Sequence, residues 1–167
     1  MTYRDDAERV VSEYGTIVYR VCRVKLASFD PSLADDAYQN TFLYYIEHPP
    51  KIEPGSEHEK AWFIRCAVSR CTDLMRKHKP ADEIPETLAA VDNDTTEVMS
   101  ALLAMDEKYR MPRYLTAVMG YSITEAAKIL SVNAPAFRMR LTRGRRMLAE
   151  SLELYDHLPK TAKEEIE

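Results

Sequence analysis

The stretch Ser122-Ile-Thr-Glu-Ala-Ala-Lys-Ile-Leu-Ser-Val132 runs directly into Asn133-Ala-Pro-Ala-Phe-Arg-Met-Arg-Leu-Thr-Arg-Gly-Arg-Arg-Met-Leu148, and together the two segments decide the fold of the C-terminal half. Ser122 and Glu125 form an S-x-x-E capping box, which predicts the start of one helix. Asn133 is a good N-cap for a second helix, and Pro135 falls in its first turn, where its missing N–H costs no hydrogen bond. Two capped helices joined by a short turn predict a helix-turn-helix, in which the second helix enters the major groove of DNA.

The second predicted helix has one apolar side and one strongly basic side. Small and apolar residues recur at helical spacing along the inner side of both segments. These inner residues are Ala126, Ala127, Ile129, Leu130, Val132, Phe137, Leu141 and Leu148. The outer side holds five arginines and no acid between residues 133 and 148. A solvated basic face on an ordinary helical hairpin is the alternative, but the two caps and the small-residue turn favour DNA binding.

Position along the recognition helix divides the predicted DNA contacts into two classes. Residues early in such a helix reach base edges, whereas later ones more often meet phosphates. We therefore assign Arg138, Met139 and Thr142 to base edges. The predicted backbone contacts are Arg140, Arg143, Arg145 and Arg146, and the predicted set also includes Asn133 and Ala136 at the start of the helix.

The charge of the chain is acidic overall but segregated along the sequence. The chain has 23 Lys+Arg against 27 Asp+Glu, a formal net charge of -4. Affinity for DNA comes largely from phosphate neutralisation, so an acidic protein needs its positive charge concentrated and some additional help. Residues 60–79 hold six Lys and Arg against one Asp, whereas residues 80–107 hold eight acids and no base. Two basic islands therefore flank an acidic strip, which argues against a protein that binds DNA strongly by itself.

The acidic strip is also where a domain boundary is expected. It contains two prolines and no sustained hydrophobic period between residues 79 and 94, which is typical of a linker. We predict an all-α fold of two small helical domains joined by this acidic linker, the C-terminal one a helix-turn-helix. The predicted segments are a domain at 1–79, a linker at 80–93, a domain at 94–155 and a polar tail at 156–167. The sequence shows neither a membrane span of about 20 apolar residues nor the apolar core of a secretion signal, so a cytoplasmic protein is expected.

The three cysteines do not suggest a metal site. Cys22, Cys66 and Cys71 contain no C-x-x-C pair, and no histidine stands at ligand spacing. This pattern favours buried, reduced thiols over zinc or disulfides. We expect no metal and no cofactor, and no constellation of nucleophile and base points to an enzyme.

The remaining elements are predicted from hydrophobic period and caps. The N-terminal half predicts helices at about 5–29, 33–47 and 60–79, with a loop at 48–59. In the C-terminal half, Asp94 and Glu97 form a D-x-x-E capping box, and Asp106 caps a further helix that Pro112 kinks or delays. The apolar residues of this pair are expected first in the core and second at an interface. They are Tyr109, Tyr114, Leu115 and Val118.

In this order, the parts resemble the bacterial sigma factors, specifically the small extracytoplasmic-function (ECF) group built from regions 2 and 4 only. The resemblance rests on Ala34-Asp-Asp-Ala-Tyr-Gln-Asn-Thr-Phe42, on Ala61-Trp-Phe-Ile-Arg-Cys-Ala67 with Asp73-Leu-Met-Arg76, and on Asp106-Glu-Lys-Tyr-Arg110 with Gly120-Tyr-Ser-Ile-Thr-Glu-Ala-Ala-Lys-Ile-Leu130. Each motif alone is weak. Four motifs in the right order around an acidic linker make a specific signal that covers nearly the whole chain.

The resemblance implies that one polar face of the second helix docks on RNA polymerase. Asp35, Asp36, Gln39 and Asn40 correspond to the residues that meet the clamp helices of the polymerase largest subunit. The family usually has another acid where Asn40 stands. An amide cannot pair ionically with an arginine, so the resemblance places more of the polymerase affinity on Asp36 and Gln39.

The resemblance also implies that the basic third helix holds the single strand of the minus-ten element. The corresponding residues are Lys60, Arg65, Arg70, Arg76 and Lys77, with Trp62 as a candidate for stacking on an unpaired base. A single tryptophan on an amphipathic helix is more often packed in the core. The loop at about 49–59 is placed like the family loop that captures an extruded base, but here Glu53, Glu57 and Glu59 repel phosphate unless they point away.

The function that follows is an alternative sigma factor. It is expected to bind the clamp helices and the flap of core RNA polymerase and to read the minus-thirty-five element with the helix-turn-helix. In this way it would direct promoter recognition, DNA melting and transcription initiation. The resemblance also implies an anti-sigma factor as a possible partner, because small sigma factors are often held inactive by an inhibitor that wedges between or clamps their two domains. Two alternatives stay open: a stand-alone helix-turn-helix regulator that binds a palindromic site without polymerase, and a helical adaptor whose arginines pair with an acidic protein.

Overall fold

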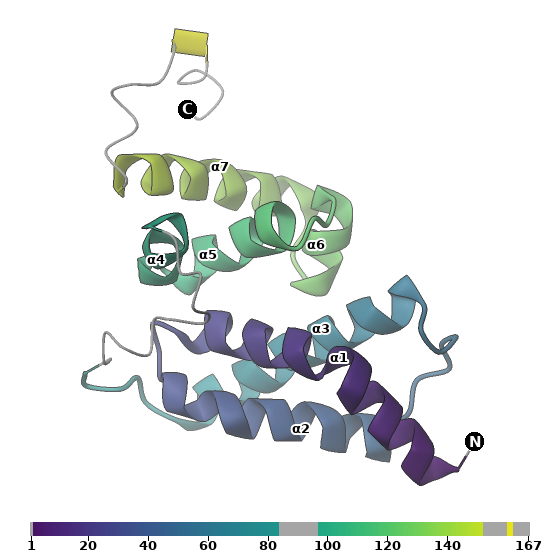
Figure 1. Ribbon diagram of the computed structural model, residues 1–167. Coiled ribbons are helices and arrows are strands. Elements are labelled where there is room, and N and C mark those ends of the chain that lie inside the picture. Colours follow the sequence, from purple (N-terminus) through teal and green to yellow (C-terminus); the bar gives the residue numbers. More distant parts are fainter. Residues whose placement is uncertain (1, 84–96, 152–159, 162–167) are drawn as a thin grey trace. The chain divides into compact units, whose positions relative to one another are not determined.

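The computed structural model describes residues 2–83, 97–151 and 160–161, and these residues form helices, turns and loops without a strand (Figure 1). The chain divides into two compact units, Met1–Ile84 and Pro85–Glu167. The all-α fold with two helical domains is therefore confirmed. The acidic linker predicted at 80–93 lies outside the described residues from residue 84 onward, as do the predicted cap Asp94 and nearly all of the 156–167 tail.

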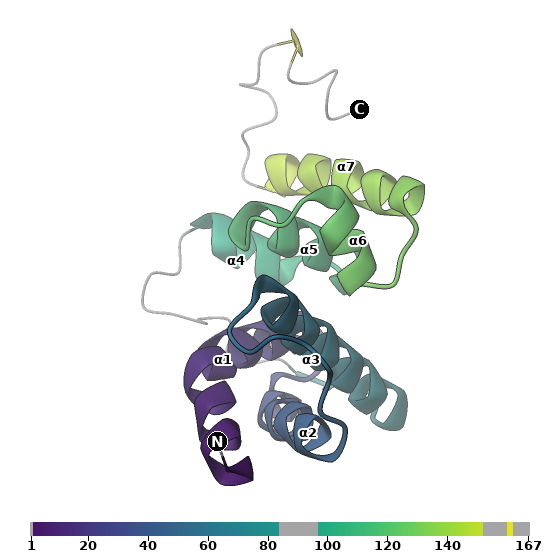
Figure 2. The ribbon, with the colours of Figure 1, turned by 90° about the vertical axis from the view of Figure 1, so that its right-hand side faces the viewer.

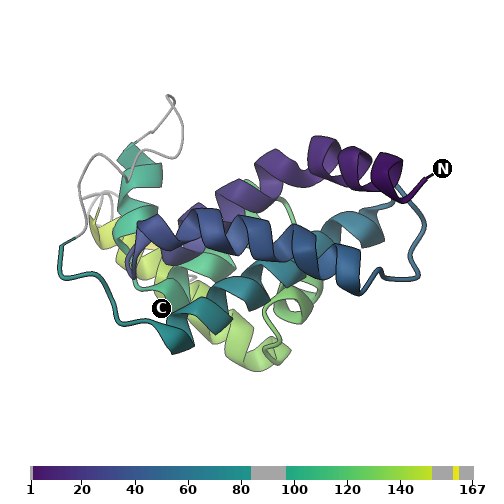
Figure 3. The same ribbon diagram turned by 90° about the horizontal axis from the view of Figure 1, so that it is seen from below.

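The first unit packs three long helices around one core. They are α1 (Tyr3–Leu26), α2 (Ala34–Glu47) and α3 (Glu57–Lys77), with a short 3-10 turn, η1 (Pro31–Leu33), before α2. Figure 2 looks nearly along α2, with α1 on one side and α3 on the other, and Figure 3 shows the same bundle from below. Each helix start has a local cause: Thr2 and Ser56 cap α1 and α3, and Asp30 caps η1.

The core of the first unit is aromatic. Phe63 of α3 is fully buried and stacks on Tyr14 of α1, with ring centroids 4.8 Å apart. Phe42 and Tyr45 of α2 meet the same ring at 5.5 and 5.0 Å. Because one phenylalanine contacts rings from two other helices, it joins all three elements of the unit.

The three cysteines lie within this bundle and are free. Cys22, Cys66 and Cys71 are all buried, as the sequence suggested. Burial raises the pKa of the Cys66 thiol to about 11. The pKa of Cys22 is raised by a hydrogen bond with Cys71 and by burial. Both thiols therefore stay protonated near neutral pH and act as small apolar groups.

Over residues 97–151, the second unit contains four α-helices and one π-helical segment. They are α4 (Glu97–Ala104), α5 (Glu107–Arg113), the π segment η3 (Tyr114–Val118), α6 (Ile123–Ile129) and α7 (Ala134–Ser151). Asp106 caps α5 by accepting a hydrogen bond from Lys108 N–H at 3.0 Å, as predicted. Pro112 lies inside α5, and the helix changes to π geometry two residues later. The expected irregularity at Pro112 is thus a change of helix type.

The π segment explains one wrong expectation about the core. Tyr114 and Leu115 are buried, but Val118 is 51% exposed and does not belong to the core. A helical period of 3.6 residues puts Val118 on the same side as its buried neighbours, whereas the wider π turn rotates it outward. Tyr109 lies between these cases and is half-buried.

Two residues of the second unit control how closely its helices approach. Arg110 is fully buried and donates hydrogen bonds to the carbonyl oxygens of Leu103, at 3.2 Å, and of Met105, so it holds the C-terminal end of α4 against α5. Burial lowers the pKa of Arg110 to about 10, which leaves it charged at neutral pH. On α7, Gly144 faces α5, and a Cβ there would lie 3.2 Å from the Tyr109 carbonyl oxygen.

No helix in the described part of the chain is long and apolar enough to cross a membrane.

Candidate nucleic-acid interface

The predicted helix-turn-helix is built as the capping residues indicate. The Ser122 hydroxyl accepts a hydrogen bond from Glu125 N–H at 3.2 Å, and the Glu125 carboxylate accepts one from Ser122 N–H at 3.1 Å, so both halves of the capping box are present. In the turn, Ser131 has a φ of 54°. This left-handed residue reverses the chain, and Val132 N–H then bonds back to the Ala127 carbonyl at 3.0 Å.

The start of α7 has the cap that the sequence predicts. The Asn133 side-chain oxygen accepts a hydrogen bond from Ala136 N–H at 2.9 Å. Asn133 is therefore the N-cap of α7, as expected, and its oxygen is engaged in the helix start. Ala136 is half-buried in the first turn.

The two sides of α7 are separated as the hydrophobic period predicts. Phe137, Leu141 and Leu148 are buried against the rest of the unit. Arg138, Met139, Arg143, Arg145 and Arg146 are exposed, whereas Arg140 and Thr142 are half-buried. Arg146 forms an ion pair with Glu150 at 3.3 Å. Among the described residues, Arg138, Arg140 and Arg143 have no ion-pair partner, so their charge remains available to a phosphate.

One further arginine joins this surface, and the sequence did not indicate it. Arg113 of α5 is half-buried, and its pKa is lowered by burial and by the nearby charge of Arg145. Two cations that repel each other in this way gain from a shared anion. The basic surface therefore extends from α7 onto α5.

The basic residues predicted on α3 divide into exposed and engaged groups. Arg65, Arg76 and Lys77 are exposed and Lys60 is half-buried. Arg70 forms an ion pair with Asp73 at 3.3 Å, and its guanidinium lies over the Tyr44 ring, 4.3 Å from the centroid. Arg76 is 3.8 Å from the same carboxylate. Among the predicted strand-binding residues of α3, Arg70 therefore makes the most contacts within the protein itself.

Trp62 is packed in the core on one side and accessible on the other. Its ring packs edge-on against Phe63 at 5.0 Å and against Tyr45 at 5.7 Å, so part of it belongs to the core. The rest is accessible and lines a groove of about 420 Å³, which we call the Trp62 groove. The other lining residues are Lys51, Ile52, Glu53, Ser56, His58, Ala61 and Arg65.

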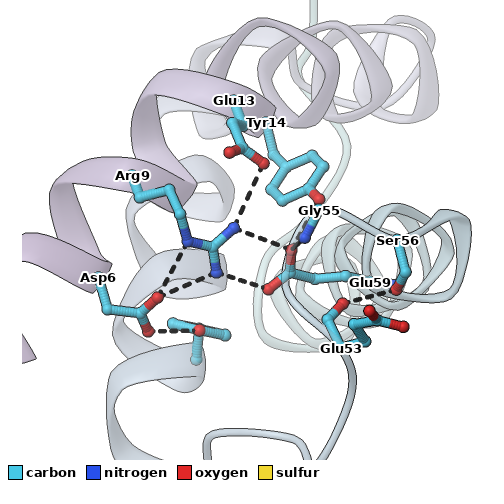
Figure 4. Close-up of polar contacts among 9 residues, drawn as sticks. Asp6, Arg9, Glu13, Tyr14, Glu53, Gly55, Ser56 and Glu59 are labelled. Carbon is cyan, nitrogen blue, oxygen red and sulfur yellow. Dashed lines mark hydrogen bonds and ion pairs between the residues drawn. The ribbon is translucent and has the colours of Figure 1, made fainter. Parts of the chain in front are cut away.

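One of the three loop carboxylates expected to repel DNA points inward. Glu59 is only 2% exposed and receives two parallel hydrogen bonds from the Arg9 guanidinium, at 2.8 and 3.0 Å (Figure 4). Tyr14 O–H donates to it at 2.7 Å, and Gly55 N–H donates at 2.7 Å. Burial alone would raise the pKa of Glu59, but the Arg9, Gly55 and Tyr14 hydrogen bonds together lower it below its usual range.

The same arginine binds two further acids of α1. Arg9 donates to Asp6 at 2.9 Å and to Glu13 at 3.3 Å, and Asp6 accepts a hydrogen bond from Tyr45 O–H at 2.6 Å (Figure 4). The sequence alone does not predict this network, because a single charged residue is usually exposed. The signal was its spacing: Glu59 stands four residues before Phe63 on the buried side of α3.

The polar face predicted on α2 is exposed as a continuous patch. Asp35, Asp36, Gln39 and Asn40 are all exposed, and within the described residues none of them has a side-chain hydrogen bond or ion pair. Leu43 follows on the same face, four residues after Gln39, and is 53% exposed. Leu43 was not among the residues predicted for this face, and a single exposed leucine is common on protein surfaces.

Comparison with known proteins finds one family model and solved structures that this chain resembles. The model of the Sigma-70 region 2 family matches residues 10–80, which include the α2 face, the Trp62 groove and α3. Comparison with curated proteins finds no match. Among solved structures, CnrH in complex with the cytosolic domain of CnrY shares 24% identity with a TM-score of 0.63, covering 90% of this chain and 89% of that chain.

A second solved structure agrees in fold over almost its entire length. It is the sigma factor RpoE from Bartonella quintana in complex with the anti-sigma factor NepR, with 21% identity and a TM-score of 0.65. The likeness covers 90% of this chain and 98% of that chain. The region 2 match spans residues 10–80, less than half of the chain, and the fold of the chain is similar to that of CnrH and of the sigma factor RpoE.

Proposed function

We propose that this protein is an alternative sigma factor that binds core RNA polymerase and directs promoter recognition, DNA melting and transcription initiation. The observation that carries the proposal is the exposed α2 patch inside the region 2 match. Asp36 and Gln39 project from a helix whose buried side is fixed by the aromatic core, so they form a rigid docking surface. The proposed partner surface is the clamp helices of the polymerase largest subunit, with the flap meeting the second unit.

The two units have separate proposed roles on DNA. Residues 1–79 bind core polymerase and the minus-ten element, for which α3 supplies Arg65 and Lys77 to the phosphates and the Trp62 groove accepts an unpaired base. The domain at 94–155 binds the minus-thirty-five element in the major groove, with Arg138 and Met139 near the base edges. Exposed cations on α3 and α7 support these assignments.

We further propose that an anti-sigma factor regulates the protein. The support is that RpoE, which shares the fold, was solved in complex with an anti-sigma factor. We expect the inhibitor to bind the exposed α2 patch, the same surface that binds polymerase. Either protein, once bound there, would then exclude the other. Competition between the two for one surface would make inhibition reversible.

The test is complex formation with bacterial core RNA polymerase at moderate salt. We expect Asp36→Arg to weaken binding by at least about tenfold, because the reversed charge faces cations on the partner and leaves them unpaired. Glu8→Arg is the matched control, since Glu8 is an exposed acid on α1 outside the patch. Wild-type protein that fails to bind polymerase contradicts the proposal and leaves the stand-alone helix-turn-helix regulator. Equal loss in both variants would show that net charge, rather than the α2 patch, governs binding.

A further inference from the structure

The wall of the Trp62 groove is held in place by a chain of contacts that starts on a different helix. Glu53 and Ser56 line the groove, and Gly55 lies between them. Gly55 N–H donates to the Glu59 carboxylate at 2.7 Å, and the Ser56 hydroxyl donates to the Glu53 carbonyl at 2.7 Å (Figure 4). The loop therefore cannot move without breaking a hydrogen bond to a buried carboxylate.

The backbone conformation of Gly55 requires an additional contact to hold it in place. Its φ is +77°, a left-handed conformation that glycine tolerates but does not strongly prefer. A local hydrogen bond is needed to select one conformation from the several open to glycine. Glu59 supplies it from the first turn of α3, where Ser56 also caps the helix by accepting from Glu59 N–H at 3.2 Å.

Glu59 is in turn oriented by α1. Two parallel hydrogen bonds from a planar guanidinium fix both the position and the plane of a carboxylate. The Arg9 side chain is only 17% exposed and also bonds to Asp6 of α1, so it does not move freely either. The path from α1 to the groove wall thus runs through Arg9, Glu59 and Gly55, each link shorter than 3.1 Å.

We propose that Arg9 and Glu59 are positioning residues for capture of an unpaired nucleobase in the Trp62 groove. Neither residue is among those that line the groove. They act by holding the loop so that the groove exists before DNA arrives, which removes the entropy of ordering the loop from the binding step. This inference rests on the proposed function, in which the groove accepts a base of the minus-ten element.

The experiment separates base capture from phosphate binding by using a probe with a single base. The probe is a fluorescent chain of abasic deoxyribose spacers that carries one adenine, cytosine, guanine or thymine at its centre, and the reference is the same chain without a base. Affinity is measured by anisotropy for holoenzyme assembled from the full-length chain and bacterial core polymerase. The readout is the ratio of the two affinities, because phosphate contacts are equal in both.

We expect the wild type to bind its preferred base about tenfold more tightly than the abasic chain, in the range of one base stacked on an aromatic ring. In Glu59→Gln this ratio should fall to within about twofold of one, while affinity for the abasic chain changes little. Glu8→Gln is the matched control. Glu8 pairs with Arg4 on the exposed side of α1, the helix that carries Arg9, and this variant should keep the wild-type ratio.

Each outcome decides between distinct explanations. A purely structural role for Glu59 would lower the melting temperature and leave the ratio intact well below that temperature, and this result would overturn the proposal. If Glu59→Gln does not fold, Arg9→Lys takes its place, because an ammonium cannot make the parallel pair and should give a reduced ratio. An unchanged ratio in Arg9→Lys overturns the proposal as well. A ratio near one in the wild type itself rejects base capture, and the positioning role with it.

Discussion

Glu59 shows how one residue makes the stability of the first unit depend on pH. Its pKa in the folded protein lies below the ordinary value of 4.5, so the charged form is the one that folding stabilises. The sign follows directly: the contribution of Glu59 is fully present above about pH 4.5 and is lost as the pH falls through the lower, folded-state value. Near neutral pH the Arg9 ion pair is therefore intact.

We predict that Glu59→Gln lowers the free energy of unfolding of this unit by about 2 kcal/mol at pH 7, since an amide cannot accept both Arg9 hydrogen bonds and no longer holds the Gly55 acceptor in a fixed plane. The difference from the wild type should shrink as the pH falls below about 4.5, because protonation removes the same charge from the wild type. Urea unfolding followed by the fluorescence of Trp62, the only tryptophan, measures this unit. A difference that stays constant down to pH 3 would contradict the assigned pKa shift. Glu8→Gln should change stability by less than about 0.5 kcal/mol at either pH.

Among the elements, α7 depends on one glycine to approach α5. A Cβ at Gly144 would lie 3.2 Å from the Tyr109 carbonyl oxygen and 3.5 Å from the Met105 methyl carbon. The methionine can move aside, but the backbone carbonyl cannot. Gly144→Ala should be close to neutral because the better helix propensity of alanine, about 1 kcal/mol, offsets this strain.

We predict that Gly144→Val destabilises the second unit by about 2 kcal/mol, since its two methyl groups enter the α5 contact and must displace backbone. Thermal unfolding followed by circular dichroism is the measurement. Arg143→Val tests the same side chain at the adjacent exposed position of α7 and should cost well under half as much. Similar losses in both variants would mean that valine propensity, rather than helix approach, causes the effect.

The elements that sequence analysis predicted well are those specified by neighbouring residues. Ser122 with Glu125, Asn133 and Asp106 each cap a helix with a group three positions away or closer, so the starts of α5, α6 and α7 followed from local chemistry. What the sequence could not show depends on distant partners. Glu59 meets Arg9 fifty positions away. Val118 has a local reason instead, because the π segment that follows Pro112 departs from the α-helical period by which the residue was placed in the core. The α2 patch was named through family resemblance, whereas its neighbour Leu43 required the structure.

For the whole molecule, the balance of charge governs whether the free chain binds DNA. Most of the described cations of α3 and α7 are exposed, yet the chain carries a net charge of -4 because acids gather between its two basic islands. Acids tethered near a basic surface compete with phosphate for it at low ionic strength. Binding to polymerase would overcome this competition by raising the effective concentration of both DNA-binding surfaces together.

We predict that changing Asp82, Glu83, Glu86, Asp92 and Asp94 to the corresponding amides raises the affinity of the free chain for duplex DNA several-fold at low salt, since it removes five negative charges and keeps the length. The gain should disappear at high salt, where exposed charges about 10 Å apart no longer interact. Filter binding or anisotropy over a salt series measures it. Neutralising Glu8 and Glu13 on α1 controls for net charge alone. An equal gain per charge in that control would assign the effect to net charge. No gain in the linker variant would contradict an inhibitory role of the acidic strip.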